Sequence, residues 1–282
     1  MSAYDKVAAA RAKGRPTGTD FIANIFEDFV ELHGDRRFGD DKAVVAGIAR
    51  LNTMPVTVVA LERGHDTKEK VFRNFGSAHP EGYRKALRQM KLAEKFGRPV
   101  VCFVDTSGAF CGIAAEERGQ GQAIAENLME MMTLRVPVVS VLIGEGGSGG
   151  ALALAVADEV WMLENAIYSV ISPEGCASIL WKDSSRVKEA SECLKLTAQD
   201  LLELKVIERV VGESGRNFHR TYQEIKQGLW ETLVRNKNLD PEELVQKRYE
   251  RFRSIGSGPA GRPAGQEMPA GPCGRQAPTA ML

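Results

Sequence analysis

The amino-acid sequence predicts an α/β fold whose sheet contains parallel strands. Two apolar segments rich in β-branched residues, 99–104 and 138–143, have the length of buried strands. A helical pattern over residues 114–134 separates these segments, so they form a strand–helix–strand unit and run parallel. Each segment leads into a loop that contains glycine. Parallel strands bring such loops to one edge of the sheet, where α/β proteins bind their ligands.

The composition is that of a protein with a full hydrophobic core, because 43% of the 282 residues are hydrophobic. Lys and Arg together number 37, as do Asp and Glu, which leaves no basic excess for nucleic acid or a membrane surface. The five cysteines lack metal-ligand spacing, so we expect no metal site. The chain starts without an apolar signal core and has no apolar run of membrane-spanning length, so we expect a cytoplasmic protein.

The amino-terminal third predicts one helix followed by two strands. Thr19 or Asp20 caps a helix whose apolar face, within residues 21–30, belongs to the core, and this helix ends at Gly34. Two strands, joined by a short polar turn, are predicted at 43–49 and 56–61. Residues 1–16 precede these elements as a separate amino-terminal segment.

A charged stretch, residues 62–76, follows the second of these strands. Its basic residues Arg63, Lys68 and Arg73 come after a strand, where they are candidates for binding substrate or phosphate. Charge runs are more often solvated loops, and we favour that interpretation here.

The remaining pattern is mostly helical. Pro80 begins a helix that extends to Phe96 and stops at Gly97. Strands are predicted at 160–163 and 206–211, and helices begin at Pro173 and cover 188–195, 200–204, 218–234 and 240–252. From residue 254 the composition changes to Gly, Pro and Ala without a repeat, which predicts a disordered tail at 254–282.

The loop after the second parallel strand, residues 144–150, has five glycines in seven positions and leads into a small-residue helix at 149–157. Because glycine has no Cβ, a ligand can reach the backbone N–H groups, and those at a helix start favour an anion. This glycine loop therefore predicts a site for a phosphate, a carboxylate or an oxyanion. The alternative is close packing of one backbone on another.

Two known patterns match this loop. Residues 144–149 match the dinucleotide-binding pattern, with Glu164 near the place of its ribose-binding acid. Residues 146–150 match a nucleophile elbow, with Asp200 and His219 downstream in the order of a catalytic triad.

A third hypothesis uses backbone groups alone. The N–H groups of residues 146–151, together with the Gly108–Ala109 turn after the first parallel strand, would form an oxyanion hole for acyl or carboxyl transfer. This hypothesis explains why no acid–base pair or metal cluster stands near either loop.

Four long segments are more specific than these patterns. Residues 73–76, 80–88, 144–153 and 168–182 closely resemble the carboxyltransferase α subunit of bacterial acetyl-CoA carboxylase, and the similarity extends from about Gly14 to Arg253. The chain departs from this family at Ser107, where Pro is usual, and at Phe110–Cys111, where Tyr-Pro is usual.

The resemblance implies a crotonase-like fold of repeated ββα units, here a domain at 17–253. It implies transfer of CO2 from carboxybiotin, on a separate carrier protein, to acetyl-CoA, giving malonyl-CoA for fatty acid biosynthesis. The implied partners are a zinc-bearing β subunit in an α2β2 assembly, without which the chain is inactive, the biotin carboxyl carrier protein and the ATP-using biotin carboxylase. A non-catalytic scaffold that binds an acyl-CoA or a partner remains an alternative, as does a biotin-independent hydrolase or isomerase.

The resemblance also implies the site residues. It assigns the oxyanion hole to the backbone of Gly149, Gly150 and Ala151 and the carboxybiotin side to Gly146, Gly147, Gly108 and Ala109. No side-chain base is required, because biotin N1 takes the proton from the acetyl methyl group. We expect Gly150→Val to abolish transfer and to leave the chain folded.

Overall fold

The computed structural model describes residues 1–213, 215 and 217–257. Within them, one mixed sheet has the strand order β1-β2-β3-β4-β5-β6-β8, and β7 pairs with the end of β5. The strands are β1 (Glu27–Glu31), β2 (Val44–Leu51), β3 (Met54–Leu61), β4 (Val100–Thr106), β5 (Val138–Gly147), β6 (Glu159–Leu163), β7 (Ile167–Ser169) and β8 (Arg209–Val211). β2 is antiparallel to both of its neighbours, β1 and β3, and β3, β4, β5, β6 and β8 are parallel. The carboxyl ends of the parallel strands therefore share one edge.

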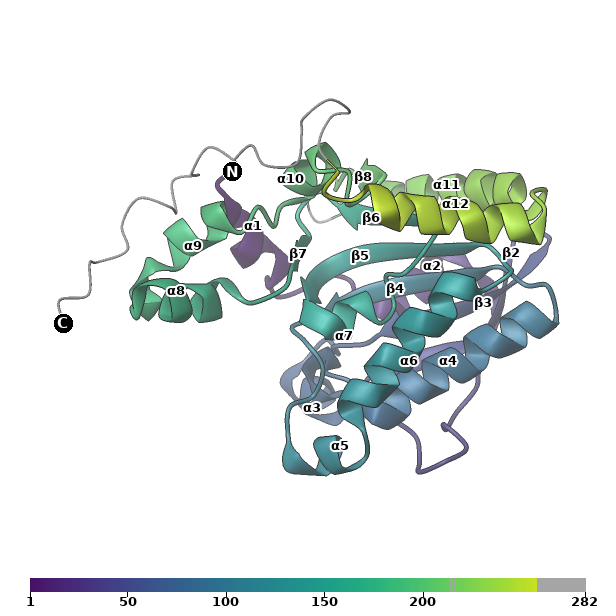
Figure 1. Cartoon of the computed structure of the whole chain (residues 1–282), viewed down its shortest axis with the longest axis horizontal. Coiled ribbons are helices and arrows are strands. Elements are labelled where there is room, and N and C mark those ends of the chain that lie inside the picture. The colour runs from purple at the N-terminus through teal and green to yellow at the C-terminus, as the bar shows by residue number, and fades with distance from the viewer. Residues whose placement is uncertain (214, 216, 258–282) are drawn as a thin grey trace.

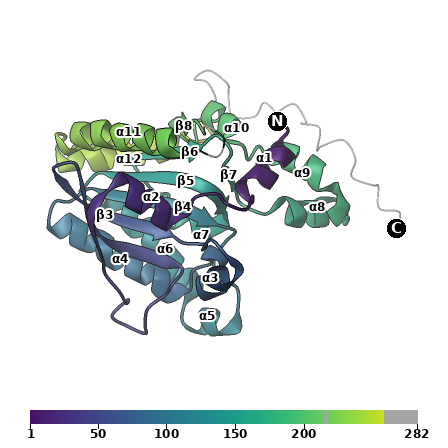
Figure 2. The same ribbon diagram turned by 180° about the vertical axis from the view of Figure 1, so that it is seen from behind.

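Helices cover both faces of this sheet (Figure 1). α4 (Pro80–Lys95), α6 (Gln120–Thr133) and α12 (Pro241–Ser254) lie on one side, and α2 (Gly18–Ile25) and α11 (His219–Lys237) lie on the other (Figures 1 and 2). The shorter helices are α3 (Thr67–Phe72), η1 (Asn74–Gly76), α5 (Ile113–Glu117), α7 (Ser148–Leu152) and α10 (Ala198–Glu203).

An arm projects from the sheet next to β7 (Figure 1). It consists of α8 (Pro173–Trp181), η2 (Ser184–Arg186) and α9 (Val187–Cys193), and α1 (Ala3–Ala10) lies against it. The arm has a small core of its own, made by Cys176, Ala177 and Ala190, which is separate from the main core. The arm is thus attached to the body mainly through the chain on either side of it and through the contact of α9 with α1.

The parallel strand–helix–strand unit is confirmed, with one difference in its helix. β4 and β5 are parallel neighbours, as the sequence predicts. The single helix expected at 114–134 is wrong, because Gly119 has a left-handed φ of +81° and separates α5 from α6. An L-residue rarely adopts this conformation, so glycine at this position marks the break.

The helix expected over residues 21–30 is wrong in its second half. α2 ends at Ile25, and β1 follows as an edge strand that pairs with β2. The signal for this pairing lies in β2, because a Cβ atom at Gly47 would overlap the carbonyl oxygen of Val30. The cap is also shifted: Thr17 is the N-cap, and Asp20 is its capping-box partner.

The segments at the two ends of the chain compare differently with the sequence predictions. Residues 1–16, for which the sequence predicts no element, contain α1, whose Val7 and Ala10 pack on Ile167 and Leu196. The predicted tail begins at the end of α12, and its residues 258–282 lie outside the described residues. None of the helices in the described part of the chain has the length and apolar character that crossing a bilayer requires.

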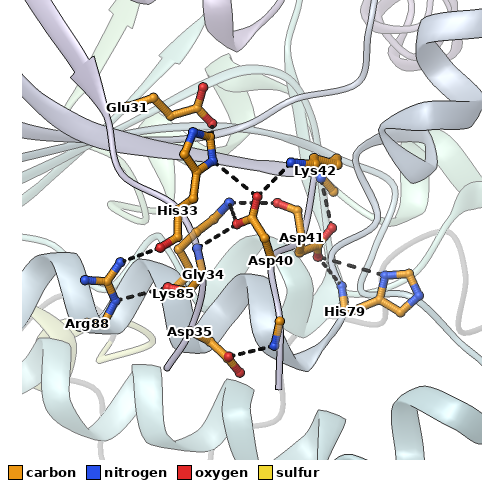
Figure 3. Close-up of polar contacts among 12 residues, drawn as sticks. Glu31, His33, Gly34, Asp35, Asp40, Asp41, Lys42, His79, Lys85 and Arg88 are labelled. Atoms are coloured by element: carbon orange, nitrogen blue, oxygen red, sulfur yellow. Dashed lines mark hydrogen bonds and ion pairs between the residues drawn. The ribbon is translucent and has the colours of Figure 1, made fainter. Parts of the chain in front are cut away.

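The loop between β1 and β2 is fixed on α4 by buried polar contacts (Figure 3). Lys85 of α4 is fully buried, and its Nζ donates to Asp40 Oδ1 at 2.6 Å and to the carbonyl oxygen of Asp41 at 2.8 Å. The Asp41 carboxylate accepts the backbone N–H groups of Ala43 at 2.9 Å and His79 at 2.6 Å. These contacts hold the loop on α4.

Asp35 is a second anchor of the same loop. Its Oδ1 accepts the backbone N–H groups of Arg37, Phe38 and Gly39 at 2.8–3.0 Å, and its Oδ2 accepts Arg84 Nε at 2.8 Å. Burial raises the pKa of this carboxyl, but the hydrogen bonds outweigh burial and lower the pKa to about 2. The ionised form is therefore favoured in the folded chain.

We expect Asp35→Asn to lower the free energy of unfolding by about 2 kcal/mol at pH 7. Because the folded pKa lies below the ordinary value, the stabilisation is present above about pH 4 and is lost as the pH falls to about 2. Urea unfolding of the wild type and of Asp35→Asn measures the difference in stability, which is expected to be smaller at pH 3 than at pH 7. Asp28→Asn at an exposed ion pair is the control, with an effect within about 0.5 kcal/mol. The same difference in stability at both pH values would contradict the lowered pKa of Asp35.

Candidate functional site

The glycine loop and the loop after β4 are neighbours at the carboxyl edge of the sheet. Thr106 of β4 pairs with Gly146 of β5, and β5 continues to Gly147 before α7 begins. Ser148 starts α7 with a φ of +53°, a left-handed value that is uncommon for a residue other than glycine. α7 ends at Leu152, five residues earlier than the sequence predicts. We call residues 107–112 the second loop.

Close packing explains four of the glycines in the glycine loop. A Cβ atom at Gly147 would overlap the carbonyl oxygen of Ser107, and one at Gly150 would overlap the backbone nitrogen of Ala109. Cβ atoms at Gly144 and Gly146 would overlap the Asp105 carboxylate and the Leu142 side chain. Gly144, Gly147 and Gly150 let the two loops and their strands approach each other, and Gly146 leaves room for Leu142 of its own strand. Close packing is the alternative that the sequence left open.

Gly149 has a different environment. A Cβ atom here would meet only Ile124 Cγ2 at 3.6 Å, an ordinary contact. Gly149, Gly150 and Ala151 belong to the first turn of α7, whose leading N–H groups have no acceptor within the helix. Ser148 is exposed and Gly149 is half-buried, whereas Gly150 and Ala151 are buried. The first turn of α7 therefore reaches the surface at Ser148 and Gly149.

The second loop is held by its own contacts. The N–H of Gly108 donates to Thr106 Oγ1 at 3.1 Å, and the N–H of Phe110 donates to the carbonyl oxygen of Ala78 at 3.0 Å. The Phe110 ring stacks on His79 with 4.0 Å between the ring centroids. Phe110, one of the departures from the family pattern, thus takes part in fixing the loop, and Cys111 next to it is an exposed free thiol.

An ionic network lies beneath the glycine loop. Asp105 Oδ1 accepts the N–H of Glu145 at 2.8 Å and pairs with Arg63 Nη1 at 3.1 Å. The Glu145 carboxylate binds Arg63 at 2.9 Å and Arg11 of the amino-terminal segment at 2.8 Å. Burial raises the pKa of Asp105, and Arg63 opposes this effect. Sequence patterns gave no signal for this network, because its members are far apart in the chain.

The three basic candidates of residues 62–76 occupy different places. Arg63 forms ion pairs with Asp105 and Glu145. It also lines a cavity of about 200 Å³, together with Arg11, Lys70 and Phe75, among other residues. Arg73 Nη1 donates to the carbonyl oxygen of Lys42 at 2.9 Å, and Lys68 is an exposed residue of α3, so neither lines this cavity. Their role in substrate binding remains a prediction, and the stretch contains a helix where a solvated loop was expected.

A small pocket of about 20 Å³ separates the glycine loop from the arm. One wall is formed by Ser107 and the glycine loop residues 145–147, and the other by residues of β7 and the start of α8. The lining residues are Ser107, Glu145, Gly146, Gly147, Ile167, Ser169, Ile171, Ser172 and Pro173. The pocket holds about one water-sized group, such as a single oxygen atom.

The structure does not favour the two other hypotheses for the glycine loop. Asp200 accepts the Thr197 hydroxyl at the start of α10, and His219 lies in a hollow with Asp20 and His65, so neither joins Ser148 in a triad. The space next to Gly144 and Gly146 is occupied by the Asp105 carboxylate and the Leu142 side chain, so no backbone is open there for a pyrophosphate. Among the described residues, no group of three or more metal-ligating side chains exists.

The fold is crotonase-like and is shared by solved transcarboxylase and malonate decarboxylase structures. A transcarboxylase 12S structure superimposes with a TM-score of 0.61 at 19% identity over 92% of this chain, which spans 45% of the transcarboxylase chain. A Pseudomonas malonate decarboxylase hetero-tetramer in complex with coenzyme A gives a TM-score of 0.62 at 18% identity, covering 77% of this chain and 89% of that one. At these identities the likeness concerns the fold.

Sequence comparison gives the family. The family model described as acetyl co-enzyme A carboxylase carboxyltransferase-like matches residues 1–256. The acetyl-coenzyme A carboxylase carboxyl transferase subunit alpha of Ruminiclostridium cellulolyticum is 68% identical over 256 residues, which are 91% of this chain and 98% of the relative. This chain belongs to that family of α subunits, as the sequence predicts. The family match begins at residue 1 and therefore includes α1, whereas the similarity was expected to start at about Gly14.

A further relative joins two subunits in one chain. The protein of Natranaerobius thermophilus named acetyl-coenzyme A carboxylase carboxyl transferase subunits beta/alpha is 56% identical over 260 residues, and the present chain spans 43% of it.

Proposed function

We propose that this chain supplies one half of a carboxyltransferase site and transfers CO2 from carboxybiotin to acetyl-CoA, forming malonyl-CoA in the cytoplasm. The observation that carries the proposal is the meeting of two backbone loops at one sheet edge, in a chain of this family. The proposed partners are a zinc-bearing β subunit in an α2β2 assembly, the biotin carboxyl carrier protein and biotin carboxylase.

The residues present suit a charged oxygen atom. In the proposed site, the N–H groups of Gly149, Gly150 and Ala151 stabilise negative charge on the ureido oxygen of the biotin substrate. Gly146 and Gly147 line the oxygen-sized pocket. The second loop contacts Gly147 through Gly108 and contacts Gly150 through Gly108 and Ala109. One such donor is typically worth about 3–4 kcal/mol of the reaction barrier.

The exposure of this edge supports a shared site. Ser107, Cys111 and Ser148 are exposed at the two loops, and a hydrogen-bond donor stabilises charge most strongly where water is excluded. A second surface is needed to cover these loops and to hold the thioester. The β subunit is the proposed source of that surface, which is why we propose that this chain alone is inactive.

The test is carboxyl transfer in reverse, from malonyl-CoA to free biotin, with this chain alone and with the co-expressed β subunit. We expect turnover in the mixture and none above background in either chain alone. Size-exclusion chromatography shows whether the complex has formed. Turnover by this chain alone would overturn the half-site, and an inactive but fully formed complex would overturn the carboxyltransferase function.

A further inference from the structure

Arg11 connects the two walls of the small pocket between the glycine loop and the arm. Its Nε donates to Glu145 Oε1 at 2.8 Å, and Glu145 belongs to the glycine-loop wall. Its Nη1 donates to Glu174 Oε1 at 2.7 Å, and Glu174 directly follows Pro173, the last residue of the arm wall. A single guanidinium group on the segment after α1 therefore bridges both walls.

Residues 167–169 of the second wall are already fixed, because β7 pairs with residues 145–147 of β5. Within the described part of the chain, the start of α8 has no such pairing, and α8 packs chiefly on α9 and η2. The core of α8 is separate from the main core, and α1 meets the far end of the arm through the N–H of Ala3 and Glu192 Oε1 at 2.8 Å. Arginine suits the bridging role, because its planar fork presents several donors in fixed directions, whereas lysine offers one ammonium group. The distance between Glu145 and the start of α8 thus depends on Arg11.

Substitution of Arg11 is not expected to unfold the chain. Glu145 is nearly buried, with 7% of its side chain exposed, but its Oε2 is paired with Arg63 at 2.9 Å and keeps a counter-charge. Glu174 is 46% exposed and becomes hydrated when its partner is removed. A variant at Arg11 therefore tests the bridge without leaving an unpaired buried charge.

We propose that Arg11 is a positioning residue: by binding Glu145 and Glu174 it holds the start of α8 at a fixed distance from the glycine loop, and so keeps the α8 side of the pocket at the width of one oxygen atom. This proposal rests on the proposed function, since the pocket lies on the biotin side of the site. Arg11 acts through the two carboxylates and does not itself contact the reacting atoms.

The experiment is a double-mutant cycle in the complex with the β subunit, using R11Q, E174Q and R11Q/E174Q. We expect each single variant to raise KM for biotin in the reverse transfer by about fivefold and to change kcat by less than about twofold. The double variant is expected to match the single variants, because each change breaks the same bridge. R11K is expected to recover part of the effect.

A second measurement does not depend on activity. Hydrogen exchange of residues 169–176 is expected to become faster in R11Q and E174Q and to stay unchanged in R135Q. Arg135 forms an exposed ion pair of similar length with Glu242 on α12, far from the arm in the fold. If the wild-type complex is inactive, the proposed function fails. The hydrogen-exchange data alone then test whether Arg11 bridges Glu145 and Glu174. Unchanged exchange and unchanged KM in R11Q, or fully additive effects in the double variant, would overturn the proposal.

Discussion

Gly150→Ala is expected to abolish carboxyl transfer and to lower the free energy of unfolding by about 3 kcal/mol. The added Cβ would overlap the backbone nitrogen of Ala109 and lie 2.8 Å from the carbonyl carbon of Gly108 and 2.9 Å from Tyr83 Oη. Two of these neighbours are backbone atoms, so the second loop has to move away from the glycine loop. Urea unfolding and reverse transfer with the β subunit measure both effects.

The matched control is Gly149→Ala, which adds the same atom one residue earlier. Its Cβ meets only Ile124 Cγ2 at 3.6 Å, so we expect a free energy of unfolding within about 0.5 kcal/mol of the wild type. Equal stability of the two variants would show that the loops do not depend on close contact at Gly150. On the same geometry we expect Gly150→Val to lower stability more than Gly150→Ala, because a larger side chain meets the same backbone. That Gly150→Val still folds stays a prediction, which the same unfolding measurement tests.

Arg248→Ala is expected to lower the free energy of unfolding by about 3–5 kcal/mol. The Arg248 side chain of α12 is fully buried and pairs with Asp158, with Nε 2.8 Å from Oδ1. It also donates to the carbonyl oxygens of Met131, Leu134 and Val136 at 2.7–3.1 Å. Removal leaves the buried Asp158 carboxylate and these carbonyl groups without their donor, which is costly in a low-dielectric interior.

Lys247→Ala on the same helix is the control for Arg248→Ala. Lys247 is 55% exposed and pairs with Glu243 one turn earlier, so its loss is expected to change stability by less than about 0.5 kcal/mol. Urea unfolding of both variants measures the difference. A loss below about 1 kcal/mol for Arg248→Ala would mean that α12 is not anchored by this contact.

The sequence predicts those parts of the fold whose signal is local. The strands that became β3, β4 and β5 are apolar, β-branched and bounded by turns, and α4 has both a proline start and a glycine stop. β1 was missed because its pairing depends on Gly47 in another strand. α1 was missed because its short apolar face packs on Ile167 and Leu196, which are far away in the sequence.

The meeting of the two glycine-bearing loops at one sheet edge was predicted, but the packing partners of the glycines were not. Two glycine-bearing loops after parallel strands locate the edge, since strand direction follows from the connecting helix. Whether a glycine serves a ligand or a neighbouring backbone depends on what faces it, and Ser107 and Ala109 face Gly147 and Gly150 from another strand end. Arg11 could not be predicted either, because its two carboxylate partners lie more than a hundred residues away.

The two edges of the sheet limit how this chain can join other chains. β1 has exposed acidic residues, Glu27 and Asp28, and an irregular register between Glu27 and Val30, and both features oppose the addition of a further strand. β8 at the opposite edge has three residues, which is too short to template a long strand. A sheet that continues from one subunit into the next is therefore disfavoured. Partners are left to contact helices and loops, so their docking does not need to disturb the hydrogen bonds that hold the glycine loop and the second loop in register.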